Sequence, residues 1–444
     1  MLINVKMIIQ KFGGTSVGTA ERMKDLVSII DDDAVRIVVL SAMSGTTNSL
    51  VEIARMLYEK DNSNANEKIN SLESGYHEVC RQLFSTKLSL EKGKELVKFH
   101  FDHMRSFTLD MFTANEEKAI LAQGELISTA LFHYYLEEIN KDSVLLPALN
   151  FMRIDENEEP DLDFIEKHLK LELNVHKGKK LFITQGYICR NSFGEIDNLK
   201  RGGSDYTATL IGAALHAEEI QIWTDIDGMH NNDPRIVQDT HPVTDLSFDE
   251  AAELAYFGAK ILHPTCVLPA QKRKVPVRLL NTMQPMAKGT LISDKKTSDR
   301  ITAVAAKDGI TAINIRSGRM LLAYGFLRSV FEVFERYKTP IDMITTSEVA
   351  VSVTIDNTKH LQAIKNELKE YGTVETDDDL TIVCIVGSFT AEKEGYAKRI
   401  FESLKDIPIR MISYGGSENN VSILVKTGLK KQTLNALNKG LFGK

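Results

Sequence analysis

The stretch MIIQKFGGTSVG at residues 7–18 decides the fold, because it joins a short apolar run to a glycine-rich turn and a helical segment. The run at 7–12 has the length of a strand, and apolar residues recur at helical spacing over 23–30. The two glycines let backbone N–H groups approach an anion closely, and Lys11 adds a full positive charge. On spacing alone, a phosphate cradle and an ordinary strand-to-helix turn are equally well supported.

The alternation of strand and helix continues over the N-terminal two thirds of the chain. Helical periodicity is clear over 119–131. Four further apolar runs have strand length, at 37–40, 181–188, 220–223 and 275–280. Strands that are apolar on both faces and alternate with helices are typical of a mostly parallel sheet covered on both sides. We therefore expect an α/β three-layer sandwich, with a helical insert over residues 50–105.

An internal repeat marks the C-terminal third. PIDMI at 340–344 recurs as PIRMI at 408–412, and each copy is followed by a Ser-Glu pair and a Val-Ser strand. Each copy also follows a helical segment, so the repeating unit is predicted to be strand–helix–strand–strand. We expect two small α+β domains after residue 298.

The composition is that of a soluble globular protein. The 444 residues include 54 basic and 61 acidic side chains, for a net charge of −7, and 43% are hydrophobic. A mildly acidic chain makes a nucleic-acid or membrane partner unexpected. The four cysteines, Cys80, Cys189, Cys266 and Cys384, are too far apart for a disulfide framework or a CxxC metal site. With no signal-peptide pattern and no apolar run of ~20 residues, we expect a cytoplasmic protein.

A second glycine pair lies in KRGGSDY at residues 200–206, again between an extended segment and a helix. Arg201 offers a fork that matches a carboxylate or a phosphate, and Ser204 and Asp205 occupy the expected N-cap position. A capped turn with a solvated arginine is the simpler alternative. A single ligand with two anionic ends would need both glycine-rich cradles.

Carboxylates and amides crowd WTDIDGMHNNDPR at residues 223–235, after a predicted strand. Loops at the carboxyl ends of parallel strands bind nucleotides in α/β sheets, although Asp-Gly and Asn-Asp pairs more often make turns. Calcium is rejected, because the downstream glutamate of an EF-hand loop is missing. Farther on, Ser247 and Glu250 have capping-box spacing before a helix that Gly258 is expected to interrupt. Lys260, in FGAKILHP, either reaches solvent or binds a phosphate.

Glu125 follows a glycine within an otherwise apolar helix, in AQGELI. A carboxylate at such a place is usually at the surface, and the alternative is a pairing with a substrate ammonium group. No histidine has a neighbouring nucleophile at a catalytic spacing, so we expect no catalytic histidine.

These segments resemble the aspartate kinases of the amino-acid kinase family. The resemblance rests on six stretches in this order: KFGGTSVG, VVLSAMSGTTNSL, FITQGYI, RGGSDYTA, WTDIDGMHNNDPR and FGAKILHP. The C-terminal repeat resembles a pair of ACT-type regulatory domains. The resemblance implies an amino-acid kinase domain at 1–298, a first ACT-like domain at 299–375 and a second at 376–444.

The resemblance implies ATP-dependent phosphorylation of the β-carboxylate of L-aspartate, with Mg²⁺ on the nucleotide and no direct protein ligand for the metal. Lys11 and Asp205 would be catalytic, Asp205 by orienting Lys11 or a magnesium-bound water. The expected phosphate and ATP ligands are Lys11, Gly13, Gly14, Ser41, Thr224, Asp225, His230, Arg235, Lys260 and Ile261. The expected aspartate ligands are Thr47, Glu125, Arg201, Gly202, Gly203 and Ser204. Among these, Glu125 would hold the ammonium group.

The first repeat resembles the effector-binding part of lysine-inhibited, single-function aspartate kinases. The implied effector is an end-product amino acid, L-lysine, with Asp342 on an ammonium group. The expected effector ligands are Met320, Ala323, Gly325, Phe326, Leu327, Pro340, Ile341, Asp342, Thr346, Ser347 and Glu348. The resemblance further implies the first step of lysine, threonine and methionine biosynthesis, and a homodimer or homotetramer assembled through the ACT-like domains. Domains that serve dimerisation alone are the simpler alternative.

Two rival functions stay open at this point. A catalytically silent amino-acid sensor would use the repeats, but it would not need the intact motifs around Lys11, Arg201 and Asp225. An amino-acid kinase with another acid acceptor, such as glutamate or carbamate, would share the fold.

Overall fold

A computed structural model describes residues 6–30, 34–109, 111–200, 202–258, 263–295, 300–317, 324–388 and 394–443. The chain forms two compact units. The first comprises Met1–Gly228 and Leu262–Asp294, and the second comprises Met229–Ile261 and Lys295–Lys444. Residues 229–261, from the last quarter of the expected catalytic part, thus cluster with the C-terminal third.

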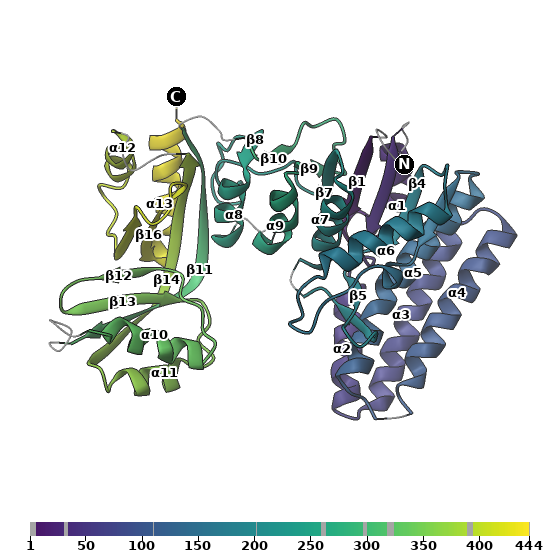
Figure 1. Cartoon of the computed structure of the whole chain (residues 1–444), viewed down its shortest axis with the longest axis horizontal. Helices are drawn as coiled ribbons and strands as arrows, with labels where there is room; N and C mark the ends of the chain where they lie inside the picture. Colours follow the sequence, from purple (N-terminus) through teal and green to yellow (C-terminus); the bar gives the residue numbers. More distant parts are fainter. Residues whose placement is uncertain are drawn as a thin grey trace. The chain divides into compact units, whose positions relative to one another are not determined.

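A mostly parallel sheet forms the centre of the first unit (Figure 1). Its strands run in the order β3-β4-β2-β1-β7-β9-β10, and neighbouring strands are parallel except for β9 and β10. The bounds are β1 Met7–Phe12, β2 Val35–Leu40, β3 Ser143–Leu146, β4 Leu181–Gln185, β7 Glu219–Thr224, β9 Val277–Asn281 and β10 Thr290–Ser293. The run expected at 181–188 is divided between β4 and a short hairpin, because Tyr187 takes a positive φ of 70°. The hairpin strands are β5 Ile188–Arg190 and β6 Ile196–Asn198.

Helices cover both faces of this sheet, which confirms the three-layer sandwich. Ile9 lies beside Gly212 of α7 on one face, whereas Phe12 belongs to the hydrophobic cluster of α5 on the other. The helices are α1 Ala20–Ile29, α2 Thr46–Tyr58, α3 Asn62–Leu83, α4 Lys87–Ser106, α5 Ala114–Glu138, α6 Leu162–Val175, α7 Gly203–Leu215 and α9 Pro264–Arg273. The expected helical insert is confirmed as α2–α4, which pack side by side (Figure 1). No helix in the described ranges combines the length and apolarity needed to cross a membrane.

One antiparallel sheet forms the centre of the second unit, in the order β12-β13-β11-β14-β16-β15. Two long strands, β11 (Arg300–Arg316) and β14 (Thr373–Ser388), run side by side through the whole unit (Figure 1). The first part of β11 pairs with the last part of β14, and the register shifts between Lys307 and Ile310. The half built from residues 310–380 is therefore inserted into the half built from 300–307 and 382–443.

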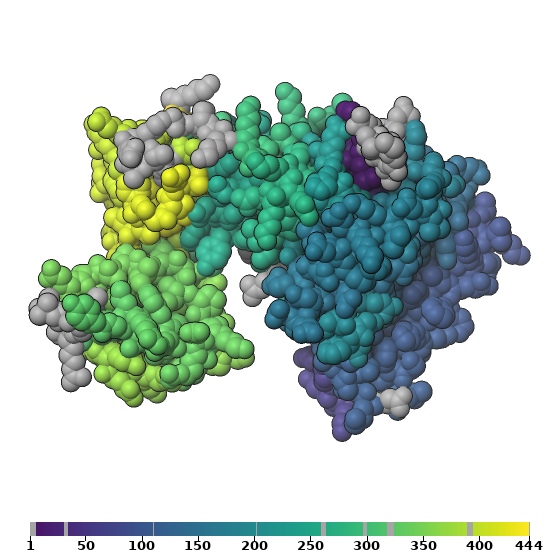
Figure 2. Space-filling model, in the orientation of Figure 1, coloured from purple at the N-terminus to yellow at the C-terminus, as the bar shows by residue number. Residues whose placement is uncertain are grey.

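Each half repeats the predicted strand–helix–strand–strand order and then adds a helix that the pattern did not predict. The first half contains α10 Phe326–Arg336, β12 Ile344–Thr346, β13 Ala350–Ile355 and α11 Leu361–Leu368. The second contains α12 Tyr396–Ser403, β15 Met411–Tyr414, β16 Asn420–Lys426 and α13 Lys430–Leu437. Each half has its own hydrophobic cluster. The two halves form separate green and yellow lobes in Figure 2. The unit also contains β8 Asp245–Ser247 and α8 Phe248–Tyr256, and α8 carries the predicted capping box.

Candidate active site

The loops marked by the sequence gather at one edge of the parallel sheet. Gly13 follows β1, Ser41 follows β2, and Asp225 follows β7. Since β1 pairs in parallel with β2 on one side and with β7 on the other, the carboxyl ends of the three strands lie together. This is the edge at which α/β sheets bind ligands.

Lys11, in β1, and Asp205, in the first turn of α7, form an ion pair. Lys11 Nζ lies 2.7 Å from Asp205 Oδ1, and the two side chains are 11% and 16% exposed. Lys11 also lies over the glycine turn, since a Cβ atom added to Gly13 would be 3.3 Å from Nζ. The N–H of Gly14 makes no hydrogen bond to any described residue. A fixed cation and an unused backbone donor at one turn suit an anionic ligand group.

Helix α7 is capped by Gly202, and not by Ser204 or Asp205. Gly202 has a φ of 78°, and a Cβ atom there would collide with Cys266 Sγ. The N-cap prediction was wrong because the Asp205 carboxylate pairs with Lys11 instead of closing the helix. The close approach also shows that the start of α9 lies against the glycine pair.

The start of α7 packs against the end of β4. A Cβ atom added to Gly203 would lie 2.5 Å from the Tyr187 ring, and one added to Gly186 would lie 2.5 Å from Ser204 Cβ. The first turn of α7, with Gly203, Ser204 and Asp205, is therefore brought to the same edge as the loops after β1 and β2, because β4 is the parallel neighbour of β2.

Glu125 is buried within α5, and the structure thus rejects the surface alternative. Its exposed fraction is 4%. Oε1 accepts a hydrogen bond of 3.1 Å from the N–H of Ala42, in the loop after β2, while the buried Oε2 has no partner. Burial raises the pKa of Glu125 to about 7, although the Ala42 N–H opposes the rise. A buried carboxylate with one unpaired oxygen suits an ammonium group.

Thr47, an expected aspartate ligand, is exposed in the first turn of α2. Its neighbour Thr46 is buried instead, and its hydroxyl lies 2.9 Å from Tyr76 Oη on α3. A cavity of about 300 Å³ opens beside this pair. The sequence analysis chose Thr47 from the SGTTNSL stretch instead of Thr46, and it missed Tyr76 because the helical insert showed only periodicity and no chemical motif.

Thr224 and Asp225 lie at the end of β7. The Thr224 hydroxyl accepts a hydrogen bond of 3.1 Å from the N–H of Ile226, and its carbonyl accepts one of 2.8 Å from the Thr282 N–H. Asp225 is exposed. The hydrogen bonds fix the strand end and leave the Asp225 carboxylate facing solvent.

Two expected ATP ligands that the structure describes belong to the second unit. His230 Nδ1 lies 2.9 Å from Thr240 Oγ1. Arg235 donates to both carboxylate oxygens of Asp233, at 2.9 and 2.8 Å. Five other predicted site residues lie outside the described residues: Arg201, Lys260, Ile261, Met320 and Ala323.

Asp342, the expected effector carboxylate, is already contacted by two side chains. Its Oδ1 accepts hydrogen bonds from Tyr256 Oη at 2.8 Å and from Lys307 Nζ at 2.7 Å. The side chain is 1% exposed, and the buried Oδ2 has no partner. Lys307 Nζ also lies 2.9 Å from Asp356 Oδ2. Sequence reasoning found Asp342 but missed Tyr256 and Lys307, which carry no motif.

The other predicted effector ligands lie in two places. The N-terminus of α10 holds Gly325 as the N-cap, followed by Phe326 and Leu327. The segment leading into and out of β12 holds Pro340, Ile341, Thr346, Ser347 and Glu348.

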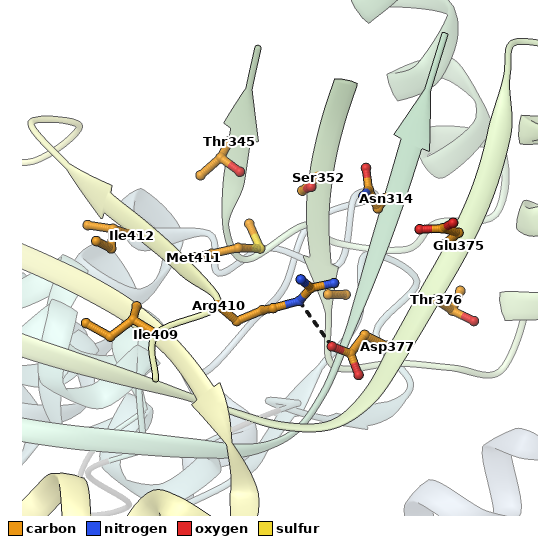
Figure 3. A pocket seen from close by; sticks show the side chains of 11 residues that line it. Asn314, Thr345, Ser352, Glu375, Thr376, Asp377, Ile409, Arg410, Met411 and Ile412 are labelled. Atoms are coloured by element: carbon orange, nitrogen blue, oxygen red, sulfur yellow. Dashed lines mark ion pairs between the residues drawn. The ribbon is translucent and has the colours of Figure 1, made fainter. Parts of the chain in front are cut away.

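A groove of about 650 Å³ lies on the antiparallel sheet of the second unit (Figure 3). Residues of β11–β14 form one side, and residues 409–412 form the other. Arg410 Nε lies 3.1 Å from Asp377 Oδ2, and the two side chains point toward each other in Figure 3. The two repeats thus share one polar groove.

Comparison with known proteins identifies the family. The Amino acid kinase family profile matches residues 6–281, and an ACT domain profile matches residues 383–441. Lysine-sensitive aspartokinase 3 of Escherichia coli is 34% identical over 98% of this chain and 99% of its own length. Aspartokinase 1, chloroplastic, of Arabidopsis thaliana is 32% identical over 98% of this chain and 80% of its own.

Solved structures agree. The chain is similar to E. coli aspartokinase III in complex with aspartate and ADP, with a TM-score of 0.83, 32% identity, and 98% and 100% of the two chains covered. It is also similar to the same enzyme in complex with lysine and aspartate, with a TM-score of 0.80, 33% identity, and 98% and 99% covered. The chain therefore belongs to the amino acid kinase family, within its aspartokinase group, and is an ATP-dependent phosphotransferase.

Proposed function

We propose that the chain transfers the γ-phosphoryl group of ATP to the β-carboxylate of L-aspartate, giving 4-phospho-L-aspartate. The observation that carries the proposal is the arrangement at the carboxyl edge of the sheet. The Lys11–Asp205 ion pair provides a fixed cation for a phosphoryl group, and the unpaired, buried oxygen of Glu125 provides a binding partner for an ammonium group. The similar E. coli enzyme, solved with aspartate and ADP, supports this pairing of ligands.

The proposed reaction needs positive charge rather than a general base. A side-chain carboxylate with a pKa of ~3.9 is already ionised at neutral pH, so the nucleophile needs no deprotonation. The obstacle is the approach of one anion to another. Lys11 and the unused N–H group of Gly14 would stabilise the phosphoryl charge, while the N–H of Gly13 donates to the Trp223 carbonyl and Asp205 holds the Lys11 ammonium in place.

Glu125 would bind the ammonium group of aspartate, and its ionised form would be stabilised by that contact. Arg201, Thr47, Gly202, Gly203 and Ser204 stay proposed contacts for the rest of the substrate. On the ATP side, Ser41, Thr224 and Asp225 are proposed from their place at the strand ends. His230, Arg235, Lys260 and Ile261 stay predictions from the resemblance.

Magnesium would enter with the nucleotide. Among the residues that the structure describes, no three His, Cys, Asp or Glu side chains form a metal cluster. Mg²⁺ on the ATP phosphates would supply further positive charge there. The donor set of this edge fits that role, because Asp205 is a carboxylate able to hold a metal-bound water.

We further propose feedback inhibition by an end-product amino acid, L-lysine, that binds to the ACT-like part. The chain would form a cytoplasmic homodimer or homotetramer. Its reaction would be the first step of lysine, threonine and methionine biosynthesis. The support is the buried, unpaired Oδ2 of Asp342 together with the similar E. coli enzyme solved with lysine. Inhibition would follow from tighter binding of lysine to a less active arrangement.

Hydroxylamine trapping tests the reaction and separates it from its rivals. The purified chain is incubated with ATP, Mg²⁺ and hydroxylamine, with L-aspartate, L-glutamate or carbamate as acceptor. We expect a hydroxamate with L-aspartate alone. A hydroxamate with another acceptor would replace the substrate, and none with any acceptor would favour a silent sensor. Adding L-lysine, L-threonine or both tests the regulation, and no response to either would overturn it.

A further inference from the structure

Helix α8 belongs to the kinase region by sequence and to the second unit, called the regulatory unit below, by packing. The kinase family profile spans residues 6–281, which include α8. In the structure, however, α8 clusters with the regulatory unit and packs beside β11 and β14 (Figure 1). A helix of the kinase region thus packs on the antiparallel sheet of the regulatory unit.

Three side chains of α8 form hydrogen bonds to three different parts of this unit: β11, the second repeat and the first repeat. Glu250, Glu253 and Tyr256 are three residues apart, so they lie within about 120° of one another around the helix. Glu250 Oε1 accepts a hydrogen bond of 2.6 Å from Thr302 Oγ1 on β11. The contacts of the other two side chains reach one repeat each.

Glu253 contacts the second repeat. Its two carboxylate oxygens accept hydrogen bonds from Ser417 Oγ at 2.9 Å and from Asn420 Nδ2 at 2.5 Å. Tyr256 contacts the first repeat, where its hydroxyl donates to Asp342 Oδ1 at 2.8 Å. One face of α8 therefore contacts both repeats through carboxylate hydrogen bonds.

Negative charge exceeds positive charge around Asp342, at one end of this face of α8. Lys307 supplies one positive charge to the carboxylates of Asp342 and Asp356 and lies 4.5 Å above the Tyr256 ring. Burial lowers the pKa of Lys307, but its hydrogen bonds to both carboxylates raise that pKa above its ordinary value, so the lysine is charged. The three groups together carry a net charge of −1. One further ammonium group, at the unpaired Oδ2 of Asp342, would balance it.

We propose that Tyr256 is the positioning residue that transmits the binding of an amino-acid ammonium group at Asp342 to helix α8, and so to the kinase region. This inference rests on the proposed regulation. An ammonium group at Oδ2 shares the carboxylate charge with Lys307 and weakens the hydrogen bond from Tyr256 to Oδ1. By reciprocity, the Tyr256 hydroxyl opposes ammonium binding by the same factor.

The test uses all 444 residues and measures binding and inhibition separately. L-Lysine and L-threonine serve as probes, binding is measured by calorimetry, and activity is measured by hydroxamate formation. For Tyr256→Phe we expect a Kd for the amino acid that is lower than in wild type, because the opposing hydroxyl is gone, and a lower kcat without effector, because the hydrogen bond that the ammonium group weakens is already absent. The ratio of the activity without amino acid to the activity at saturating amino acid should fall about fivefold from the wild-type ratio, because the coupling is lost.

Tyr337→Phe is the matched control. Tyr337 also donates its hydroxyl to a carboxylate, that of Glu367, but both residues lie within the first repeat. It should respond as wild type does, and a change equal to that of Tyr256→Phe would overturn the assignment. If Tyr256→Phe fails to fold, Glu253→Gln tests the same face of α8, with the same split between binding and inhibition expected.

The remaining outcomes are distinguishable. Full inhibition of Tyr256→Phe, or a parallel loss of binding and inhibition, refutes the coupling and leaves the regulation standing. A wild-type chain that neither binds nor responds to either amino acid refutes the regulation, and the coupling with it.

Discussion

Replacing Glu125 by glutamine should make the first unit more stable at alkaline pH while it weakens aspartate binding. The reason is that the buried Oε2 of Glu125 has no partner in the protein, so its ionised form is costly until a ligand ammonium group arrives. Glutamine keeps an oxygen for the N–H of Ala42 and removes the charge.

The size of the gain follows from the pKa. Burial raises the pKa of Glu125 from 4.5 to about 7, and at ~1.36 kcal/mol per pH unit that difference corresponds to about 3 kcal/mol. Because the folded form holds its proton more tightly than the unfolded form, the wild-type chain loses this stability as pH rises from 4.5 to 7. The advantage of the glutamine variant is therefore greatest above pH 7 and absent below pH 4.5.

Thermal unfolding of the two proteins across pH 5–8.5 measures this gain. About 3 kcal/mol in a unit of this size corresponds to an increase in Tm of several degrees at pH 8. Glu67→Gln, at an exposed position of α3, is the matched control and should show no such difference. The KM for aspartate of the wild-type enzyme should also rise as pH falls below 7, because protonated Glu125 cannot pair with an ammonium group.

Two results would refute this reasoning. A Glu125→Gln variant with an unchanged or lower Tm at pH 8 would show that the Glu125 carboxylate is compensated within the protein. A stability difference that stayed constant from pH 5 to pH 8.5 would show that titration of this group is not its source.

Three further substitutions test the rest of the site. Lys11→Ala should lower kcat by a factor of ~10² to 10³ while aspartate binding stays detectable by calorimetry, and near-normal turnover would remove Lys11 from its role. Asp205→Asn breaks the 2.7 Å ion pair, so kcat should fall by about tenfold or more with a smaller change in the KM for aspartate; an effect on that KM alone would make Asp205 a substrate contact. Gly202→Ala should lower stability by about 2 kcal/mol or more, because alanine disfavours a φ of 78° and its Cβ would collide with Cys266, and an unchanged Tm would contradict this.

The sequence predicts the fold well where the pattern is local. The run at 7–12 coincides with β1, and the Ser247–Glu250 capping box begins α8 as expected. The repeat predicts the two halves of the second unit, but not the pairing of β11 with β14 across both halves. That pairing joins residues far apart in the chain. Local periodicity predicts a strand but not its partner, so it does not predict which part of a long strand pairs with which other strand.

The candidate site divides in the same way. Glycine pairs, Lys11 and Asp225 stand out because strand ends and turns have sequence signatures. The partners that set their chemistry do not, since the N–H of Ala42 and the hydroxyl of Tyr256 become relevant only through tertiary contacts. The N-cap prediction at Ser204 and Asp205 was wrong for the same reason, because a contact with Lys11 outweighs the local preference of aspartate for a helix cap.

Glu125 and Asp342 show one chemical solution used in both units. Each carboxylate is buried, each has one oxygen bound by the chain, and each leaves the other oxygen without a partner. An unpaired buried carboxylate destabilises the folded chain, so its presence at both places expected to meet an amino-acid ammonium group is hard to explain by packing. The difference between them lies in the neighbours. Lys307 already compensates part of the charge at Asp342, whereas no such lysine contacts Glu125 among the described residues. An ammonium ligand should therefore gain more binding free energy at Glu125 than at Asp342. Tighter binding suits a substrate site at Glu125, and weaker binding suits an effector site at Asp342.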